Sequence, residues 1–232
     1  MKLLRRKVKE RRKTPVSLIL YSNPTSLITE QYKQLRTNIE FSAVDKQIKS
    51  IMVTSPEPGD GKSTTAANLA IVLAQQGKQV VLVDADLRKP SVHYTFQLDN
   101  LNGLTSVITK QTALENAICQ TYVLNLNILT SGPIPPNPSE LLNSRNMESV
   151  IEEINRKYDY IIFDTPPALA VTDAKILSNK CDGIVMVIAS EKTNKQEAKK
   201  AKKMLQNSKA PLLGVVYNKE NIKPDNYNYL YE

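Results

Sequence analysis

The sequence predicts a single α/β domain with a mostly parallel central sheet and helices on both of its faces. Three observations lead to this fold class. Short apolar runs alternate with longer amphipathic segments along the 232-residue chain, as in a parallel sheet with crossover helices. The short runs are nearly continuous in Val, Ile and Leu, which is typical of strands covered on both faces. No internal repeat or second domain boundary interrupts this order.

The pattern places each element in turn. Strands are expected at residues 50–55, 79–85, 126–131, 160–165, 183–190 and 212–218. Helices are expected at residues 26–43, 62–76, 138–157, 173–180 and 194–207. Gly77 is expected to close the second helix, and the prolines of "SGPIPPNPSE" to mark the start of the third. The first helix carries an apolar stripe of Ile28, Tyr32, Leu35 and Ile39.

The net charge of +8 is concentrated at the N-terminus, where residues 1–13 contain eight Lys or Arg and one Glu. This block predicts a flexible basic arm over residues 1–25 and leaves the rest of the chain nearly neutral. Such an arm suits DNA, anionic lipid or an acidic partner segment, and it also suits a plain solubilising tail. Because the fold itself is not basic, no nucleic-acid partner is expected.

Composition excludes several other classes of protein. No run of eighteen apolar residues is present, so no membrane-spanning segment is expected. The start, "MKLLRRKVKERRK", has no apolar stretch after its charges and does not resemble a secretory signal. Cys119 and Cys181 are isolated, and the single histidine, His93, cannot complete a zinc site with them. A reducing cytoplasm is the expected location.

The strongest chemical signal is "SPEPGDGKSTT", which follows the first expected strand and opens a helix. Glycines allow backbone amides to converge on phosphate oxygens, a lysine reaches the outer phosphates, and a hydroxyl can ligate Mg²⁺. Pro56 stands where GxxxxGK[ST] has its first glycine, so the amides from about Gly59 onward must bind the phosphate. The alternative is an ordinary turn with an exposed lysine. The expected nucleotide contacts are Gly59, Asp60, Gly61, Lys62, Ser63 and Thr64.

Acidic residues end two further expected strands. Asp84 and Asp86 lie at the C-terminal end of the strand in "VVLVDADLRKP", and Asp164 lies at the end of the one in "YIIFDTPP". The ligand crevice of an open α/β sheet lies at the carboxyl ends of its strands, where the phosphate loop also lies. The three carboxylates are therefore expected to converge near a nucleotide-bound Mg²⁺. Any one of them alone could instead be a helix cap or turn residue.

Together these motifs resemble those of the bacterial tyrosine kinases of capsule and exopolysaccharide synthesis, in the separate cytoplasmic form known as the CapB/CpsD type. The resemblance rests on "GDGKST", "VVLVDADLR" and "IIFDTPP", and it extends from "EQYKQLRTNIEF" through "LTSGPIPPNPSELL" to the tyrosine-rich end. It implies a P-loop NTPase fold over residues 26–220. The wider relatives are the MinD, ParA and Mrp-type ATPases, which carry an additional lysine early in the loop. Glu57 holds that place here.

The resemblance also implies roles for individual residues, with ATP and Mg²⁺ as cofactors. Lys62, Ser63 and Thr64 match the family's phosphate and magnesium contacts, and Asp86 and Asp164 match its metal-shell aspartates. Asp84 is the carboxylate expected to orient the incoming tyrosine hydroxyl and accept its proton, so that the catalytic set is Lys62, Asp84 and Asp86. Asn218 matches a position that contacts the base in related ATPases.

Assembly and regulation are implied in the same way. In the family's ExxRxxR ring motif, Glu30 and Arg36 match and Lys33 replaces the middle arginine over the expected oligomerisation helix 26–43. These residues could equally be solvated helix charges. The resemblance implies a ring-shaped homo-oligomer, activation by the cytoplasmic tail of a membrane-embedded polysaccharide chain-length regulator, and a cognate tyrosine phosphatase. The kinase is then cytoplasmic and recruited to the inner face of the cell membrane.

The C-terminal stretch "NYNYLYE" carries the expected phosphate acceptors, Tyr227, Tyr229 and Tyr231. Residues 221–232 follow a polar segment that favours a flexible tail over an edge strand. In a ring such a tail is expected to reach a neighbour's site and to be phosphorylated in trans.

Two rival functions remain open from the sequence. One is a positioning ATPase of the MinD or ParA kind without kinase activity, which the missing early lysine and the tyrosine tail disfavour. The other is a non-catalytic regulatory subunit, which Lys62, Asp84, Asp86 and Asp164 disfavour.

Overall fold

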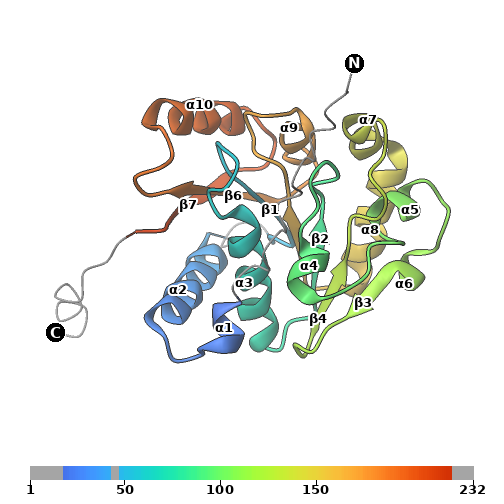
Figure 1. Ribbon diagram of the computed structural model, residues 1–232, viewed down its shortest axis with the longest axis horizontal. Coiled ribbons are helices and arrows are strands. Elements are labelled where there is room, and N and C mark those ends of the chain that lie inside the picture. The colour runs from blue at the N-terminus through green and yellow to red at the C-terminus, as the bar shows by residue number, and fades with distance from the viewer. Residues whose placement is uncertain (1–17, 43–46, 221–232) are drawn as a thin grey trace, which may run out of the picture.

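A seven-stranded sheet forms the centre of the computed structural model, which describes residues 18–42 and 47–220 (Figure 1). The strand order is β3-β4-β2-β5-β1-β6-β7, and every neighbouring pair is parallel except β3 and β4. The predicted fold class is thereby confirmed. The strands are β1 (Ser50–Thr54), β2 (Val80–Asp84), β3 (Ile118–Gln120), β4 (Leu126–Leu129), β5 (Tyr160–Asp164), β6 (Gly183–Ala189) and β7 (Leu212–Asn218).

All six expected strands are present, and five of them end one or two residues before their predicted ends. Strand β3 was not predicted. It is three residues long, only partly buried, and pairs antiparallel with β4 at one edge of the sheet. Such a short segment lacks the apolar run by which the other strands were found.

Helices cover both faces of the sheet, and alternate residues of each strand enter one of two buried clusters. In β1, Ile51 and Val53 pack on one face and Met52 on the other. The first face is covered by α1 (Ile19–Ser22), α2 (Leu27–Phe41), α3 (Lys62–Gln75) and α4 (Val92–Phe96). The second is covered by α5 (Leu104–Ile108), α6 (Leu114–Ala117), α7 (Pro138–Asn143), α8 (Arg145–Lys157), α9 (Asp173–Leu177) and α10 (Lys195–Gln206).

Helix α3 positions the candidate site because it runs directly from the loop after β1. Every residue from Thr65 to Ala74 is buried, and the helix packs against β1, β2 and β5. Its many alanines lack bulk, so they let the helix lie close to the sheet. Gly77 ends it as predicted, with φ +86° and its N–H donating to the Ala74 carbonyl at 2.9 Å.

One predicted helix is wrong. Residues 138–157 form two helices, α7 and α8, separated at Ser144. Ser144 has an extended backbone, and its hydroxyl accepts a hydrogen bond from the Met147 N–H, which makes it the N-cap of α8. The helix expected at 173–180 ends at Leu177. Helices α4, α5 and α6, each of five residues or fewer, were not predicted.

Part of the predicted arm belongs to the described fold. Leu18 and Leu20 are buried against the α3 side of the sheet, and residues 19–22 form α1. The predicted arm boundary at residue 25 is therefore wrong, because these residues belong to the core. The basic block itself and the tail at 221–232 lie outside the described residues. Among the described helices, none has both the length and the apolar character to cross a bilayer.

Candidate active site

The loop between β1 and α3 has the strand-loop-helix arrangement that the motif predicted. Gly59 and Gly61 have φ values of +80° and +102°, which side chains other than glycine rarely adopt. A Cβ on Gly61 would lie 1.9 Å from the Asn218 Nδ2 atom, so no larger residue fits there without displacing that side chain. Lys62 then begins α3 directly after Gly61.

The backbone amides of this loop are free to bind an anion. Among the residues that the structure describes, the N–H groups of Gly59, Asp60 and Gly61 donate to no other group. The N-terminus of α3 adds its partial positive charge at the same place. Free amides beside a helix N-terminus form a phosphate-binding cradle.

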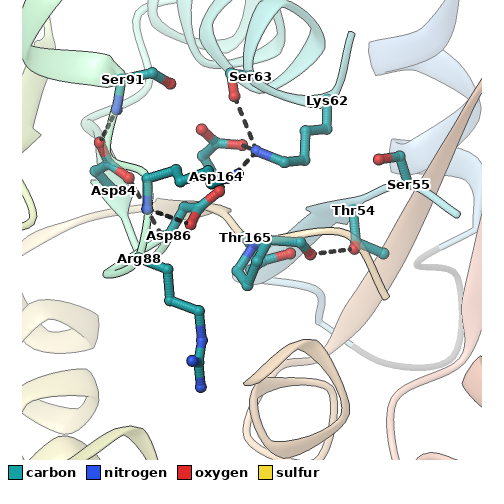
Figure 2. A network of polar contacts seen from close by, with 12 residues as sticks. Thr54, Ser55, Lys62, Ser63, Asp84, Asp86, Arg88, Ser91, Asp164 and Thr165 are labelled. Carbon is teal, nitrogen blue, oxygen red and sulfur yellow. Dashed lines mark hydrogen bonds and ion pairs between the residues drawn. The ribbon is translucent and has the colours of Figure 1, made fainter. Parts of the chain in front are cut away.

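Lys62 lies across the carboxyl ends of the strands (Figure 2). Its Nζ atom is 3.2 Å from Asp86 Oδ2, 3.5 Å from Asp164 Oδ1 and 3.2 Å from Ser63 Oγ. Burial alone would lower the pKa of Lys62, but the charges of Asp164, Asp86 and Asp84 outweigh it and raise that pKa. The lysine is therefore a fixed positive charge beside the free amides.

Asp84 and Asp164 face each other because β2 and β5 pair in register at these two residues. Asp84 is fully buried, and its Oδ2 accepts N–H bonds from Ser91 and Val92 at 2.9 and 3.0 Å. Its Oδ1 accepts the Asp86 N–H at 3.2 Å. Burial, followed by the charge of Asp164, raises the pKa of Asp84 to about 7 against the effect of these amides. Asp84 thus also anchors the turn that leads into α4.

The surroundings of Asp164 indicate whether Mg²⁺ fits this site. It is fully buried, and neither carboxylate oxygen accepts a hydrogen bond from any described residue. Burial raises the pKa of Asp164, with Lys62 acting in the opposite direction. A buried carboxylate without donors, beside two other aspartates and a serine hydroxyl, is a suitable ligand for a hard cation.

The three aspartates, which were expected to converge near one Mg²⁺, do not form a complete metal site by themselves. The described part of the chain contains no group of three or more acidic, His or Cys side chains placed to hold a metal by themselves. Mg²⁺ commonly keeps waters and phosphate oxygens and uses only one or two protein carboxylates. The donor set therefore fits a nucleotide-bound ion.

The remaining expected nucleotide contacts lie around the same loop. Thr64 is in the first turn of α3. The buried Asp60 carboxylate accepts the Glu57 N–H at 3.0 Å, which braces the loop from inside. Asn218, at the end of β7, donates its side-chain N–H to the Asp60 carbonyl at 2.9 Å. Asn218 therefore lies beside the phosphate loop, and a base contact by it stays a prediction.

The expected ring residues lie away from this crevice, on α2. Glu30 and Lys33 form an ion pair of 2.6 Å with each other, one turn apart and exposed. The Arg36 Nε is buried and has no hydrogen-bond partner among the described residues. Of the three, Arg36 is the residue with a buried donor atom that has no partner within the described part of the subunit.

The sequence alone indicated no role for Arg88, which ends the motif "VVLVDADLR". Arg88 makes a two-pronged ion pair with the buried Asp173, at 2.9 and 3.1 Å, and also reaches the Ser139 hydroxyl at 3.0 Å. Figure 2 shows its side chain directed away from Lys62. Arg88 therefore ties the segment after β2 to α7 and α9.

Two further lysines contact the phosphate loop from outside and were also missed. Lys192, between β6 and α10, donates to the Pro58 carbonyl, and Lys219, just after β7, donates to the Gly59 carbonyl. Neither belongs to a spaced motif, so only the folded structure brings them to the loop.

Comparison with known proteins supports this arrangement. A family model described as "AAA domain" matches residues 48–211. The chain is 54% identical over 214 residues to tyrosine-protein kinase YwqD of Bacillus subtilis, across 92% of this chain and 90% of that protein.

Solved structures agree. The chimerical protein CapA2B2 matches with a TM-score of 0.85 and 43% identity, over 89% of this chain and 92% of that one. The septum site-determining protein MinD of Pyrococcus horikoshii, complexed with Mg-ADP, matches with a TM-score of 0.64 and 26% identity, over 77% and 75% of the two chains. The fold is thus that of the P-loop NTPases, and the chain belongs to the family of bacterial tyrosine-protein kinases.

Proposed function

We propose that this protein is a tyrosine autokinase that uses ATP and Mg²⁺ to phosphorylate its own C-terminal tyrosines, and that it regulates capsular or extracellular polysaccharide synthesis. The observation that carries the proposal is the placement of Lys62. It lies between Asp86 and Asp164 and beside a loop with three free amides. Positioning and charge stabilisation of this kind account for most of the catalysis of phosphoryl transfer.

Each part of the site has a task in binding ATP. The amides of Gly59, Asp60 and Gly61 and the N-terminus of α3 bind phosphate oxygens. Lys62 neutralises charge on the outer phosphates, and Thr64 adds a hydroxyl in the first turn of α3. Ser63, Asp86 and Asp164 would hold the magnesium ion, which would supply positive charge to the transferring phosphoryl group. Asn218 holds the loop and lies where the base is expected.

Asp84 acts on the incoming tyrosine, while Asp86 completes the catalytic set beside Lys62 and the magnesium ion. A phenol has a reference pKa of about 10, so a nearby carboxylate helps to orient it and to accept its proton as the bond to phosphorus forms. The raised pKa of Asp84, about 7, is close to that of an effective general base. Its Oδ1 accepts a single amide and is the more available oxygen.

The substrates are Tyr227, Tyr229 and Tyr231, which lie outside the described residues. They are proposed to enter the crevice of a neighbouring subunit in a ring formed through Glu30, Lys33 and Arg36. Each phosphate adds about −1.5 to −2 charge. The acidic crevice then repels the modified tail, so the unphosphorylated protein is the more oligomeric form.

The partners follow from the same proposal. The cytoplasmic tail of a membrane-embedded chain-length regulator recruits the kinase to the inner face of the membrane and activates it. A cognate tyrosine phosphatase resets the tail. The basic block at residues 1–13 has the charge to contact anionic lipid.

A positioning ATPase without kinase activity is the alternative, and the structural similarity to MinD favours it. The feature against it is Glu57, which stands where that group carries its early lysine. Glu57 contributes an amide to the Asp60 carboxylate and no positive charge to the loop.

The deciding experiment incubates the full chain with ATP, Mg²⁺ and candidate activator tail peptides and maps phosphate by mass spectrometry. Labelling of Tyr227, Tyr229 and Tyr231 is expected, with loss in Lys62→Met and in a variant with all three tyrosines changed to Phe. Mixing Lys62→Met with the triple-Phe variant should restore label on the former if transfer occurs in trans. ATP hydrolysis with no phosphotyrosine on any protein would favour the positioning ATPase.

A further inference from the structure

Three consecutive carbonyl groups of the phosphate loop are each held by a side chain from another part of the fold. Lys192 Nζ lies 2.5 Å from the Pro58 carbonyl oxygen, Lys219 Nζ 2.8 Å from that of Gly59, and Asn218 Nδ2 2.9 Å from that of Asp60. The donors come from the β6–α10 connection and from the end of β7. They form a row of contacts along the outer side of the loop.

This row fixes the direction of the amides. A trans peptide unit is planar, so the carbonyl of one residue and the N–H of the next point to opposite sides. Holding the carbonyls of Pro58, Gly59 and Asp60 outward therefore directs the N–H groups of Gly59, Asp60 and Gly61 inward. Each of these three amides donates to no other described group.

The backbone beside both lysines is itself unusual. Glu191, which precedes Lys192, and Lys219 have φ values of +58° and +60°. Residues other than glycine occupy this left-handed region at a cost, and such strain persists where the surrounding structure holds it. Two of the five described non-glycine residues with positive φ therefore lie at the points from which these lysines reach the loop.

The short distance between Lys192 and the loop gives a second reason for glycine at position 59. A Cβ on Gly59 would lie 2.8 Å from Lys192 Nζ, so a larger residue would displace the lysine. Lys192 Nζ also lies 3.5 Å from Asp60 Oδ1 and thereby joins the carbonyl contacts to the buried brace within the loop.

We propose that Lys192 and Lys219 are positioning residues that, together with Asn218, hold the phosphate loop with its amides directed at the nucleotide. The proposal rests on the nucleotide-binding part of the proposed function and does not depend on tyrosine as the acceptor. The lysines act through the loop and do not touch the phosphates.

The test compares Lys192→Met, Lys219→Met and the double variant with Lys192→Arg and Lys219→Arg, which keep a charged donor. Lys199→Met, on the exposed face of α10, removes one charge away from the loop and is the matched control. Two quantities are measured in the full chain: the Kd for a fluorescent ADP analogue with Mg²⁺, and, without nucleotide, hydrogen exchange of the Glu57 amide, which donates to Asp60 Oδ2 within the loop.

The double Met variant is expected to bind nucleotide about tenfold more weakly, since each lysine supplies one charge-assisted hydrogen bond that is partly screened by water. Its Glu57 amide should exchange several-fold faster, and the Arg variants should recover most of both changes. Lys199→Met should alter neither quantity.

Two results would overturn the positioning role. One is a Kd of the double Met variant within twofold of the parent value. The other is a raised Kd of that variant with unchanged amide exchange, which would indicate simple charge attraction to the nucleotide. If the parent protein binds nucleotide but makes no phosphotyrosine, the proposed kinase function fails while this test still decides the role of the lysines. A parent that binds no nucleotide would overturn both.

Discussion

Two lysine–carboxylate pairs in this protein have comparable distances but very different surroundings. Lys62 lies 3.2 Å from Asp86, with side chains 11% and 6% exposed, whereas Lys33 lies 2.6 Å from Glu30, with side chains 42% and 51% exposed. Water screens the pair on α2 and leaves it little net energy. The crevice pair is surrounded by further carboxylates in a poorly solvated place, where charge acts strongly. Burial and neighbouring charges, and not distance, separate a functional ion pair from a surface one.

The largest effect is expected from Lys62→Met. Loss of this charge removes stabilisation from the transferring phosphoryl group, and autophosphorylation should fall about a thousandfold, the scale of removing one preorganised donor. Quantitative phosphotyrosine immunoblotting measures the rate, and circular dichroism checks the fold. Lys199→Met, on the exposed face of α10 and outside the proposed ring contact, is the matched control and should leave both activity and fold unchanged. Activity of Lys62→Met above a tenth of the parent would break the distinction between the two pairs.

Asp164→Asn should separate activity from stability. The amide has the same shape but no charge, so repulsion among Asp84, Asp86 and Asp164 decreases in the nucleotide-free protein. The free energy of unfolding is expected to rise by about 1 kcal/mol, which raises Tm by roughly 2–4 °C for a domain of this size. Autophosphorylation should fall at least about a hundredfold through loss of the magnesium ligand.

Differential scanning fluorimetry without nucleotide measures this stability change. A Tm below that of the parent would show that the contact of Asp164 with Lys62 outweighs the repulsion among the carboxylates. It would then be the attraction, and not the crowding of like charges, that dominates the crevice.

Arg88→Ala gives an intermediate case, because Arg88 is partly exposed while its partner Asp173 is buried. Leaving the Asp173 carboxylate with only the Ser139 hydroxyl should cost about 2 kcal/mol, less than the loss of a partner from a fully buried pair. Urea denaturation measures the cost. The double variant Arg88→Ala with Asp173→Asn should recover part of it, since no unpaired charge remains. Equal stability of the single and double variants would contradict this account.

The smallest effect is expected on α2. Glu30→Gln and Lys33→Met should each change the stability of the single subunit by less than about 0.5 kcal/mol. Any larger consequence should appear only in assembly, which analytical ultracentrifugation measures. A stability loss above about 1 kcal/mol in the monomer would show that exposure does not weaken this pair as argued.

Most of the fold could be predicted because its strands are continuous apolar runs that bury both faces. Six of these strands and the start of α3 needed no tertiary information. The break at Ser144 was missed because a serine inside an amphipathic pattern ends a helix only when its hydroxyl caps the next one. Strand β3 and the short helices α4, α5 and α6 carry too few residues for a periodicity.

The same distinction between local patterns and tertiary contacts applies to the residues of the site. The sequence identified Lys62, Asp84, Asp86 and Asp164 because each lies at or after the end of a strand, at a fixed place in a local motif. Lys192, Lys219 and the partners of Arg88 were not, because they meet their targets only through the arrangement of distant elements. The alternative of a turn or cap residue also applies in part to Asp84, because its oxygens accept the N–H groups of Asp86, Ser91 and Val92.

The register of β2 against β5 has one further consequence. Neighbouring parallel strands lie about 4.8 Å apart, and Asp84 and Asp164 occupy matching positions on them. Their separation is therefore dictated by the backbone ladder, which no side-chain substitution elsewhere can stretch. The distance between the two carboxylates also depends on the length of each side chain. Aspartate and glutamate are therefore not interchangeable at these two positions, because one added methylene would move a carboxylate across the crevice.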